Sequence, residues 1–159
     1  MNYKELADDS KVWIYQSSRD LTDEEVDEIK KHSKNFIAGW AAHGAELKAA
    51  LEIFYNRFIV LFADESQVKA SGCSIDSSVH FMQKIQDAYQ LDLFDRLNIA
   101  FKLSSKIDTL RMNDFQEALE NGRLTENTTV FNNLVESKAA FESNWEVPLK
   151  DSWHKQLIS

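Results

Sequence analysis

Cysteine, proline and glycine are all scarce in this chain: among 159 residues there are one cysteine, one proline and four glycines. A single cysteine, Cys73, excludes an internal disulfide and a four-cysteine zinc site, and it favours a reducing compartment. No stretch approaches the ~20 uncharged apolar residues that cross a membrane, and residues 1–9 lack the apolar core of a signal peptide. We therefore expect a cytoplasmic protein without a membrane span.

Basic residues are also fewer than acidic ones: the chain has 18 Lys and Arg residues and 26 Asp and Glu residues, which gives a formal net charge of -8. Such a chain repels the phosphate backbone of nucleic acids, which we exclude as a partner. The composition is that of a folded protein, with 43% hydrophobic and 11% aromatic residues. At this length a hydrophobic core forms without metals or disulfides, so we expect residues 1–159 to form a single domain.

Histidine is too sparsely placed for a metal site. The four histidines are His32, His43, His80 and His154, and no two of them have the i, i+4 spacing of a zinc-binding helix. No cofactor-binding motif is complete either. We therefore predict neither a metal nor a cofactor.

The pattern of apolar residues predicts an α+β fold. Runs of β-branched and aromatic residues predict strands, and apolar residues at helical spacing predict helices. The predicted strands cover residues 11–16, 47–55, 58–63, 98–103, 107–110 and 128–135. The predicted helices cover residues 23–42, 71–89, a segment capped by Asn113 and ended by Gly122, and residues 137–144. The order begins βαββα, and we expect a mostly antiparallel sheet of about five to six strands covered by three or so helices in two layers.

Local signals mark the boundaries of the first elements. Thr22 followed by Glu25 is a capping box that begins the first helix, and Gly44 suits the left-handed conformation beyond its end. Asn56-Arg57 interrupts two apolar runs, which leaves two interpretations: a tight hairpin, or one continuous bent strand. The acidic residues within 20–28 occupy the first helical turns, where they complement the dipole, so we interpret them as a solvated face.

The tryptophans are predicted to be core and tail anchors. Trp13 lies within a predicted strand and Trp40 on the apolar face of the first helix, so we expect both in the core. Trp153-His154 lies near the end of the chain. We expect this pair to fold back over the domain, with docking on a partner as the alternative.

Five segments, at residues 12–17, 55–59, 71–76, 98–102 and 144–154, form a distinctive set that spans nearly the whole chain. Together they resemble a family of short bacterial proteins that are commonly labelled "ABC transporter ATPase". The resemblance implies membership of that family. It implies neither an activity nor catalytic residues, because none is assigned in the family.

The ATPase label requires a phosphate-binding loop of the form G-x-x-x-x-G-K-[ST], and this chain has no complete one. Gly39 and Gly44 have the glycine spacing, but Ala45 and Glu46 follow them. A lysine for the phosphates is therefore missing, and a carboxylate replaces the hydroxyl that binds magnesium. The segment also follows a predicted helix, whereas a phosphate-binding loop follows a strand. We predict that the protein is not an ATPase.

The small-residue loop that begins at Ser71 and runs into the second predicted helix is the strongest candidate site. Free N–H groups and the dipole at a helix N-terminus favour an anion. Gly72 lets the backbone approach a ligand, and Ser71, Ser74 and Ser77 offer hydroxyl groups. Arg57 would clamp an anion if the hairpin converged on this loop.

The same loop holds Cys73, which leads to an enzymatic alternative. A thiolate at a helix N-terminus is a nucleophile, His43 could serve as its general base beside Arg57, and Asp76 is a further catalytic candidate. The simpler interpretation makes Ser74 or Asp76 an N-cap and Cys73 a small buried hydrophobe. We expect Cys73 to be buried.

Taken together, these patterns favour a noncatalytic binding or adaptor protein with an anion or small-ligand site at Ser71–Ser78. A small cysteine-dependent enzyme is the alternative. The partner would be a small anion or another protein, and the sequence does not predict an oligomeric state.

Overall fold

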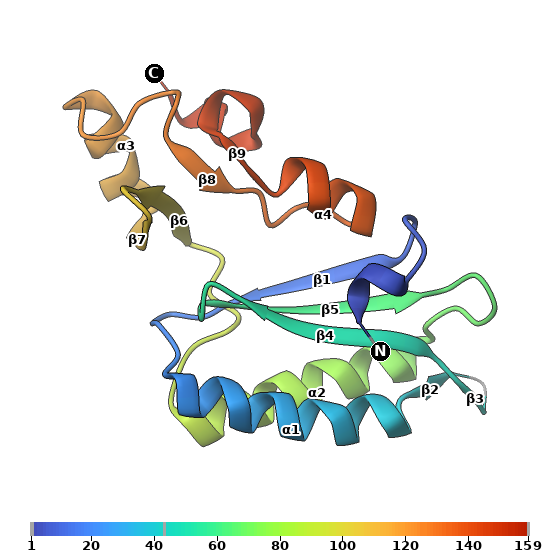
Figure 1. Cartoon of the computed structure of the whole chain (residues 1–159). Coiled ribbons are helices and arrows are strands. Elements are labelled where there is room, and N and C mark those ends of the chain that lie inside the picture. The colour runs from blue at the N-terminus through green and yellow to red at the C-terminus, as the bar shows by residue number, and fades with distance from the viewer. Residues whose placement is uncertain (1, 43, 159) are drawn as a thin grey trace. The chain divides into compact units, whose positions relative to one another are not determined.

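A computed structural model describes residues 2–42 and 44–158. The described chain consists of helices and antiparallel strands (Figure 1), which confirms the α+β class. It divides into two compact units, of which the first extends to Phe94 and includes Ser137–Ala139. The second contains Asp95–Glu136 and the residues from Ala140 onward. The single domain expected over residues 1–159 stays a prediction.

The first unit has two layers, a sheet and a pair of helices. Strands β1 (Lys11–Gln16), β5 (Phe58–Asp64) and β4 (Lys48–Phe54) form an antiparallel sheet in that order. Helices α1 (Asp23–Gly39) and α2 (Gly72–Tyr89) lie side by side along one face of this sheet (Figure 1). Because β5 has a neighbour on each side, it is the most buried of the three strands.

Helix α1 begins where the capping box predicts. The Thr22 hydroxyl accepts a hydrogen bond from the Glu25 N–H (3.1 Å), and the Glu25 carboxylate accepts one from the Thr22 N–H (2.9 Å). The apolar pattern predicted that this helix continues to residue 42, but it ends at Gly39. Instead Ala41–Ala42 forms strand β2, which pairs with β3 (Ala45–Glu46). Short strands of this kind carry no periodic signal that separates them from a helix end.

The connection between β4 and β5 is a tight hairpin, so the alternative of a continuous bent strand is wrong. Tyr55 and Asn56 have positive φ angles of 57° and 50°, and the Arg57 N–H donates to the Phe54 carbonyl at 3.0 Å. Positive φ at both central residues is the geometry whose twist matches that of antiparallel strands. Asparagine tolerates it better than most residues, which is the signal that predicted the turn.

Buried apolar side chains hold the two helices against the sheet. The first cluster contains Tyr15, Leu21, Val26, Ile29, Ile59, Met82, Ile85, Leu91 and Leu93. A second cluster surrounds Trp40, which is only 2% exposed, as the core prediction requires. The Trp40 indole N–H donates to the Ser74 carbonyl at 2.8 Å, so this side chain joins the end of α1 to the start of α2.

The second unit is built on a four-stranded antiparallel sheet in the order β7-β6-β8-β9. Its strands are β6 (Asn98–Leu103), β7 (Lys106–Arg111), β8 (Thr129–Phe131) and β9 (Glu146–Pro148). The remaining helical elements of the chain are η1 (Tyr3–Glu5), α3 (Met112–Glu120), α4 (Lys138–Asn144), η2 (Leu149–Asp151) and η3 (Trp153–Leu157). The described strands thus divide into sheets of three, two and four strands, where the sequence predicted one sheet of about five to six.

Two boundaries and one strand in the second unit differ from the predictions. Helix α3 begins at Met112 with Arg111 at its N-cap and no side-chain cap, so the predicted cap at Asn113 is wrong. Strand β8 is shorter than predicted because the chain turns after Phe131. Strand β9 was not predicted, since its three residues include Pro148 and lack an alternating pattern.

The C-terminal pair folds back, as expected. His154 is 1% exposed, and its ring lies 3.9 Å from that of Trp153 in a stacked arrangement. The His154 Nδ1 and the Ser152 hydroxyl are 2.7 Å apart. Trp153 packs against a core cluster that includes Phe115, so both aromatic side chains belong to the core of the second unit.

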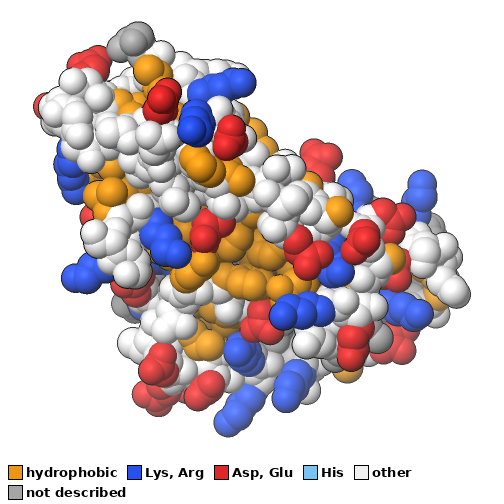
Figure 2. Space-filling model, turned by 45° about the horizontal axis from the view of Figure 1, so that its top comes forward, with side chains coloured by type: hydrophobic (Ala, Val, Ile, Leu, Met, Phe, Trp, Pro, Cys, Tyr) orange, Lys and Arg blue, Asp and Glu red, His pale blue; other side chains and the backbone are white. Residues whose placement is uncertain are grey.

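The surface in Figure 2 mixes charges of both signs. Lys and Arg side chains are interspersed there with Asp and Glu side chains, and apolar atoms are exposed between them. Within residues 2–42 and 44–158, no helix combines the length and apolar content needed to cross a membrane.

Candidate functional site

The predicted loop at Ser71 forms the capped start of helix α2. Ser71 is the N-cap, and its hydroxyl accepts a hydrogen bond from the Ser74 N–H at 3.1 Å. The prediction that Ser74 or Asp76 caps this helix is therefore wrong. Ser74 is 4% exposed, and its hydroxyl donates to the Ala41 carbonyl. The Ser71 and Ser74 hydroxyls thus serve the local structure, with their oxygen atoms 2.9 Å apart.

Cys73 is exposed in the first turn of α2, so the expectation that it is buried is wrong. The helix presents Ser74 and Ser78 to the interior instead, at 4% and 1% exposure. Asp76 is exposed as well, and Gly72 is the first residue of the helix. The general base proposed for the thiol, His43, lies outside the described residues.

Arg57 does not converge on this loop. Its guanidinium donates to the Ser17 and Ser18 carbonyls, at 3.2 and 3.3 Å, and to the Asp20 carboxylate at 3.0 Å. Arg57 precedes strand β5, whereas Ser71 follows it, and a seven-residue strand spans roughly 20 Å. Arg57 is 6% exposed and holds the β1–α1 connection, so the expected anion clamp at the start of α2 is wrong.

Gly39 and Gly44, which have the spacing of a phosphate-binding loop, lie at a helix end and between two short strands. Gly39 ends helix α1, and Gly44, with a φ of 78°, lies between β2 and β3. A phosphate-binding loop connects a strand to a helix, which is not the setting of either glycine.

Helices α1 and α2 are antiparallel and are joined near both ends. Near one end, the Trp40 indole bonds the Ser74 carbonyl, and the rings of Phe36 and Phe81 stack at 4.5 Å. At the other end, Arg19 bridges the start of α1 and the end of α2. We call these two sets of contacts the Trp40 closure and the Arg19 closure. Between the same two helices lies an open groove of about 580 Å³.

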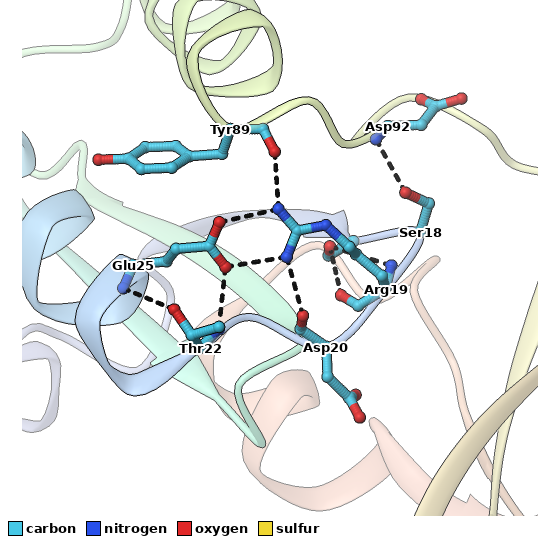
Figure 3. A network of polar contacts seen from close by, with 8 residues as sticks. Ser18, Arg19, Asp20, Thr22, Glu25, Tyr89 and Asp92 are labelled. Carbon is cyan, nitrogen blue, oxygen red and sulfur yellow. Dashed lines mark hydrogen bonds and ion pairs between the residues drawn. The ribbon is translucent and has the colours of Figure 1, made fainter.

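Figure 3 shows the Arg19 closure in detail. The Arg19 guanidinium donates two hydrogen bonds of 2.8 Å to the Glu25 carboxylate and one of 2.6 Å to the Tyr89 carbonyl. The hydrogen bonds from Arg19, followed by that from the Thr22 backbone, lower the pKa of Glu25 from 4.5 to about 2. A cation at the last carbonyl of α2 also complements its dipole. Ser18 and Asp92 exchange two further bonds of 2.9 Å nearby.

The floor of the groove is apolar and aromatic. Phe36 from α1 and Phe81, Ile85 and Tyr89 from α2 line it, and all four are buried or half-buried. On α2 these residues follow one another at four-residue intervals, so they form a stripe along a single helix face. Burial and then a hydrogen bond to Glu28 raise the pKa of Tyr89.

The rim of the groove is solvent-exposed and, apart from one alanine, polar. It consists of His32, Asn35, Ser77, His80, Lys84 and Ala88. Among the described residues that line the groove, none is Asp or Glu. The only charged type at the rim is therefore basic, in a chain whose formal net charge is -8.

Of the residues predicted to bind a ligand, only Ser77 lines this groove. The sequence carries part of the missing signal, because Phe81, Ile85 and Tyr89 have the spacing of one helix face. What it could not predict is that α1 leaves this face partly uncovered. Buried Ser74 and Ser78 take interior positions that apolar periodicity assigned to residues such as Ile75, which is 36% exposed.

Comparison of the chain with protein-family models, curated proteins and solved structures finds no match. The family membership inferred from the five segments therefore stays a prediction.

Proposed function

We propose that this protein is a noncatalytic binding module that holds a small ligand in the groove between helices α1 and α2. The observation that carries the proposal is a groove of about 580 Å³ with an aromatic floor and a polar rim. Ligand sites in proteins have volumes of roughly 300–1,000 Å³ and combine apolar walls with a few polar groups. A reducing, cytoplasmic setting belongs to the same proposal, because it suits the single cysteine.

Two features support binding at this position over a role in packing alone. The floor residues Phe36 and Phe81 stack on each other, yet both remain partly accessible from the groove. The closures at Trp40 and Arg19 hold the helices at both ends, so the groove is formed before a ligand arrives. A site that is already formed avoids the entropic cost of ordering upon binding.

A neutral fluorescent probe tests the proposal. N-Phenyl-1-naphthylamine brightens in apolar sites, and we expect saturable enhancement with the wild-type protein. Ala88→Phe places a ring in the groove and should abolish most of the enhancement, because Ala88 lines the rim.

Ala38→Phe is the matched control, since Ala38 is exposed on α1 and does not line the groove. It should bind the probe as the wild type does, with an unchanged melting temperature in both variants. Equal enhancement in Ala88→Phe and Ala38→Phe would place the probe elsewhere and contradict the proposal.

A further inference from the structure

We infer that the groove selects small amphiphilic anions, molecules with an apolar body and a single carboxylate or comparable acidic group. This inference rests on the proposed function and specifies its ligand class. The stacked Phe36 and Phe81 rings and Ile85 would receive the apolar body, and the Lys84 ammonium would face the anionic end.

The charges around the groove carry the inference. Lys84 is exposed at the rim and forms no ion pair with any described residue. His32 and His80 line the same groove, and both can donate hydrogen bonds through a ring N–H. The described lining therefore offers a ligand carboxylate donors on three side chains and no carboxylate that would repel it.

The charges of the groove also disfavour cationic and neutral amphiphiles as its ligands. A cationic amphiphile would meet Lys84 with like charge and would find no acidic partner in the described lining. Glu28, which does not line the groove, is engaged with the hydroxyl of the lining residue Tyr89. A neutral amphiphile would use the floor alone.

The volume favours a small molecule over a peptide helix. About 580 Å³ lies within the range of pockets that enclose small ligands. A docked helix would instead need an apolar groove that receives anchors over at least about two helical turns from both of its walls. The groove instead has a short lining on α1, where His32, Asn35 and Phe36 span little more than one turn.

Displacement of the neutral probe by octanoate, octanol and octylammonium at pH 8 and fixed ionic strength tests the inference. The three competitors share one alkyl chain and differ only in the charge of the head group. Octanoate should displace the probe at a concentration about tenfold lower than octylammonium, since reversing the ligand charge reverses its interaction with Lys84. Octanol reports binding to the floor independently of charge.

Two lysine variants test whether Lys84 is the source of the preference for octanoate. Lys84→Gln should weaken octanoate binding by about threefold, whereas Lys34→Gln, which removes the same charge from an exposed site on α1 outside the groove, should change it by less than about twofold. Equal displacement by octanoate and octylammonium, with octanol still active, would overturn the anion selectivity and leave the binding proposal standing. No displacement by any of the three would also overturn the inference, while the probe comparison of Ala88→Phe with Ala38→Phe still decides the binding proposal. Displacement by an acidic amphipathic peptide but by none of the three would replace the small ligand with a protein partner.

Discussion

Trp40 is a buried side chain that joins the end of α1 to the start of α2. It is 2% exposed, its indole bonds the Ser74 carbonyl, and Trp13 and Phe36 contact its ring. Trp40→Ala should therefore lower the free energy of unfolding by about 3–5 kcal/mol, as truncation of large buried aromatics does. Urea denaturation measures this loss, with Ile75→Ala as the exposed control at under about 1 kcal/mol. Equal losses in the two variants would mean that Trp40 is not a core residue.

His154 makes the second unit sensitive to acid. Burial lowers the pKa of His154 from 6.5 to about 4. As the pH falls below 6.5, the unfolded imidazole gains a proton while the folded one stays neutral. The unfolded state then binds more protons, so the contribution of His154 is complete above pH 6.5 and is lost progressively as the pH falls towards 4.

The expected loss between pH 7 and pH 5 is about 2 kcal/mol. Urea unfolding of the wild type and His154→Gln at both pH values measures it, because the glutamine variant cannot titrate at this position. The wild type should lose about 2 kcal/mol more than the variant over this interval. An equal loss in the two proteins would show that the imidazole of His154 has the same pKa in the folded and unfolded states, and would contradict the prediction.

Cys73 should react without unfolding, because its thiol is exposed in the first turn of α2. Iodoacetamide should modify the native protein completely, and urea should not be required. Cys73→Ser should change the free energy of unfolding by no more than about 0.5 kcal/mol, as exposed substitutions do. Alkylation that begins only in denaturant would restore the buried position expected from the sequence. Loss of probe binding in Cys73→Ser would argue for a functional thiol.

At the scale of elements, the Arg19 closure determines how the start of α1 meets the end of α2. Removing the guanidinium in Arg19→Met eliminates its bonds to Glu25 and to the Tyr89 carbonyl. The Arg19 side chain is 40% exposed, so solvent screening limits the expected loss of stability to about 1 kcal/mol. The exposed pair Lys30–Glu52, broken in Lys30→Met, is the control and should contribute less than about 0.5 kcal/mol.

A carbon-detected titration measures the pKa of Glu25, which reports the bond from Arg19 directly, whereas a loss of stability could also come from altered packing. The pKa of Glu25, about 2 in the wild type, should rise towards its usual 4.5 in Arg19→Met, because the largest cause of its depression is the bond from Arg19. The stability that Glu25 contributes is present above pH 4.5 and is lost as the pH falls towards 2, a range that lies mostly below that of His154. An unchanged Glu25 pKa in the variant would contradict the role of Arg19.

Sequence reasoning succeeded where the determining chemistry is local. The Thr22–Glu25 capping box and the turn at Asn56 depend on residues within one turn of each other. The capping box was predicted, and the turn was one of the two interpretations that the sequence left open. The α2 N-cap is equally local, but several adjacent serines could fill it, and Ser71 does. Strand β9 depends on pairing with a distant strand, which no local pattern records.

The candidate site was harder to predict because it belongs to two helices at once. Ser77, His80 and Lys84 lie on α2, while His32 and Phe36 lie on α1. Their proximity follows from the antiparallel packing of the helices, which a single sequence without its fold does not specify. The expected clamp at Arg57 failed for the same reason, since its partners are decided by the β1–α1 connection.

At the scale of the molecule, the proposed site lies wholly within the first unit. Helices α1 and α2 both belong to the segment that extends to Phe94, so ligand binding requires no residue of the second unit. The acid sensitivity assigned to His154 belongs to the second unit. Destabilisation through His154 and loss of binding through Ala88 or Lys84 are therefore separable effects.

A nuclear magnetic resonance titration tests the central claim, that the groove between α1 and α2 is the binding site. Backbone amide shifts of ¹⁵N-labelled protein would be followed as octanoate is added. The largest changes should fall within residues 32–36 of α1 and 77–89 of α2, the two faces that line the groove. Largest changes at Gly72 and Cys73, where α2 starts, or in the unit from Asp95 onward, would contradict the claim.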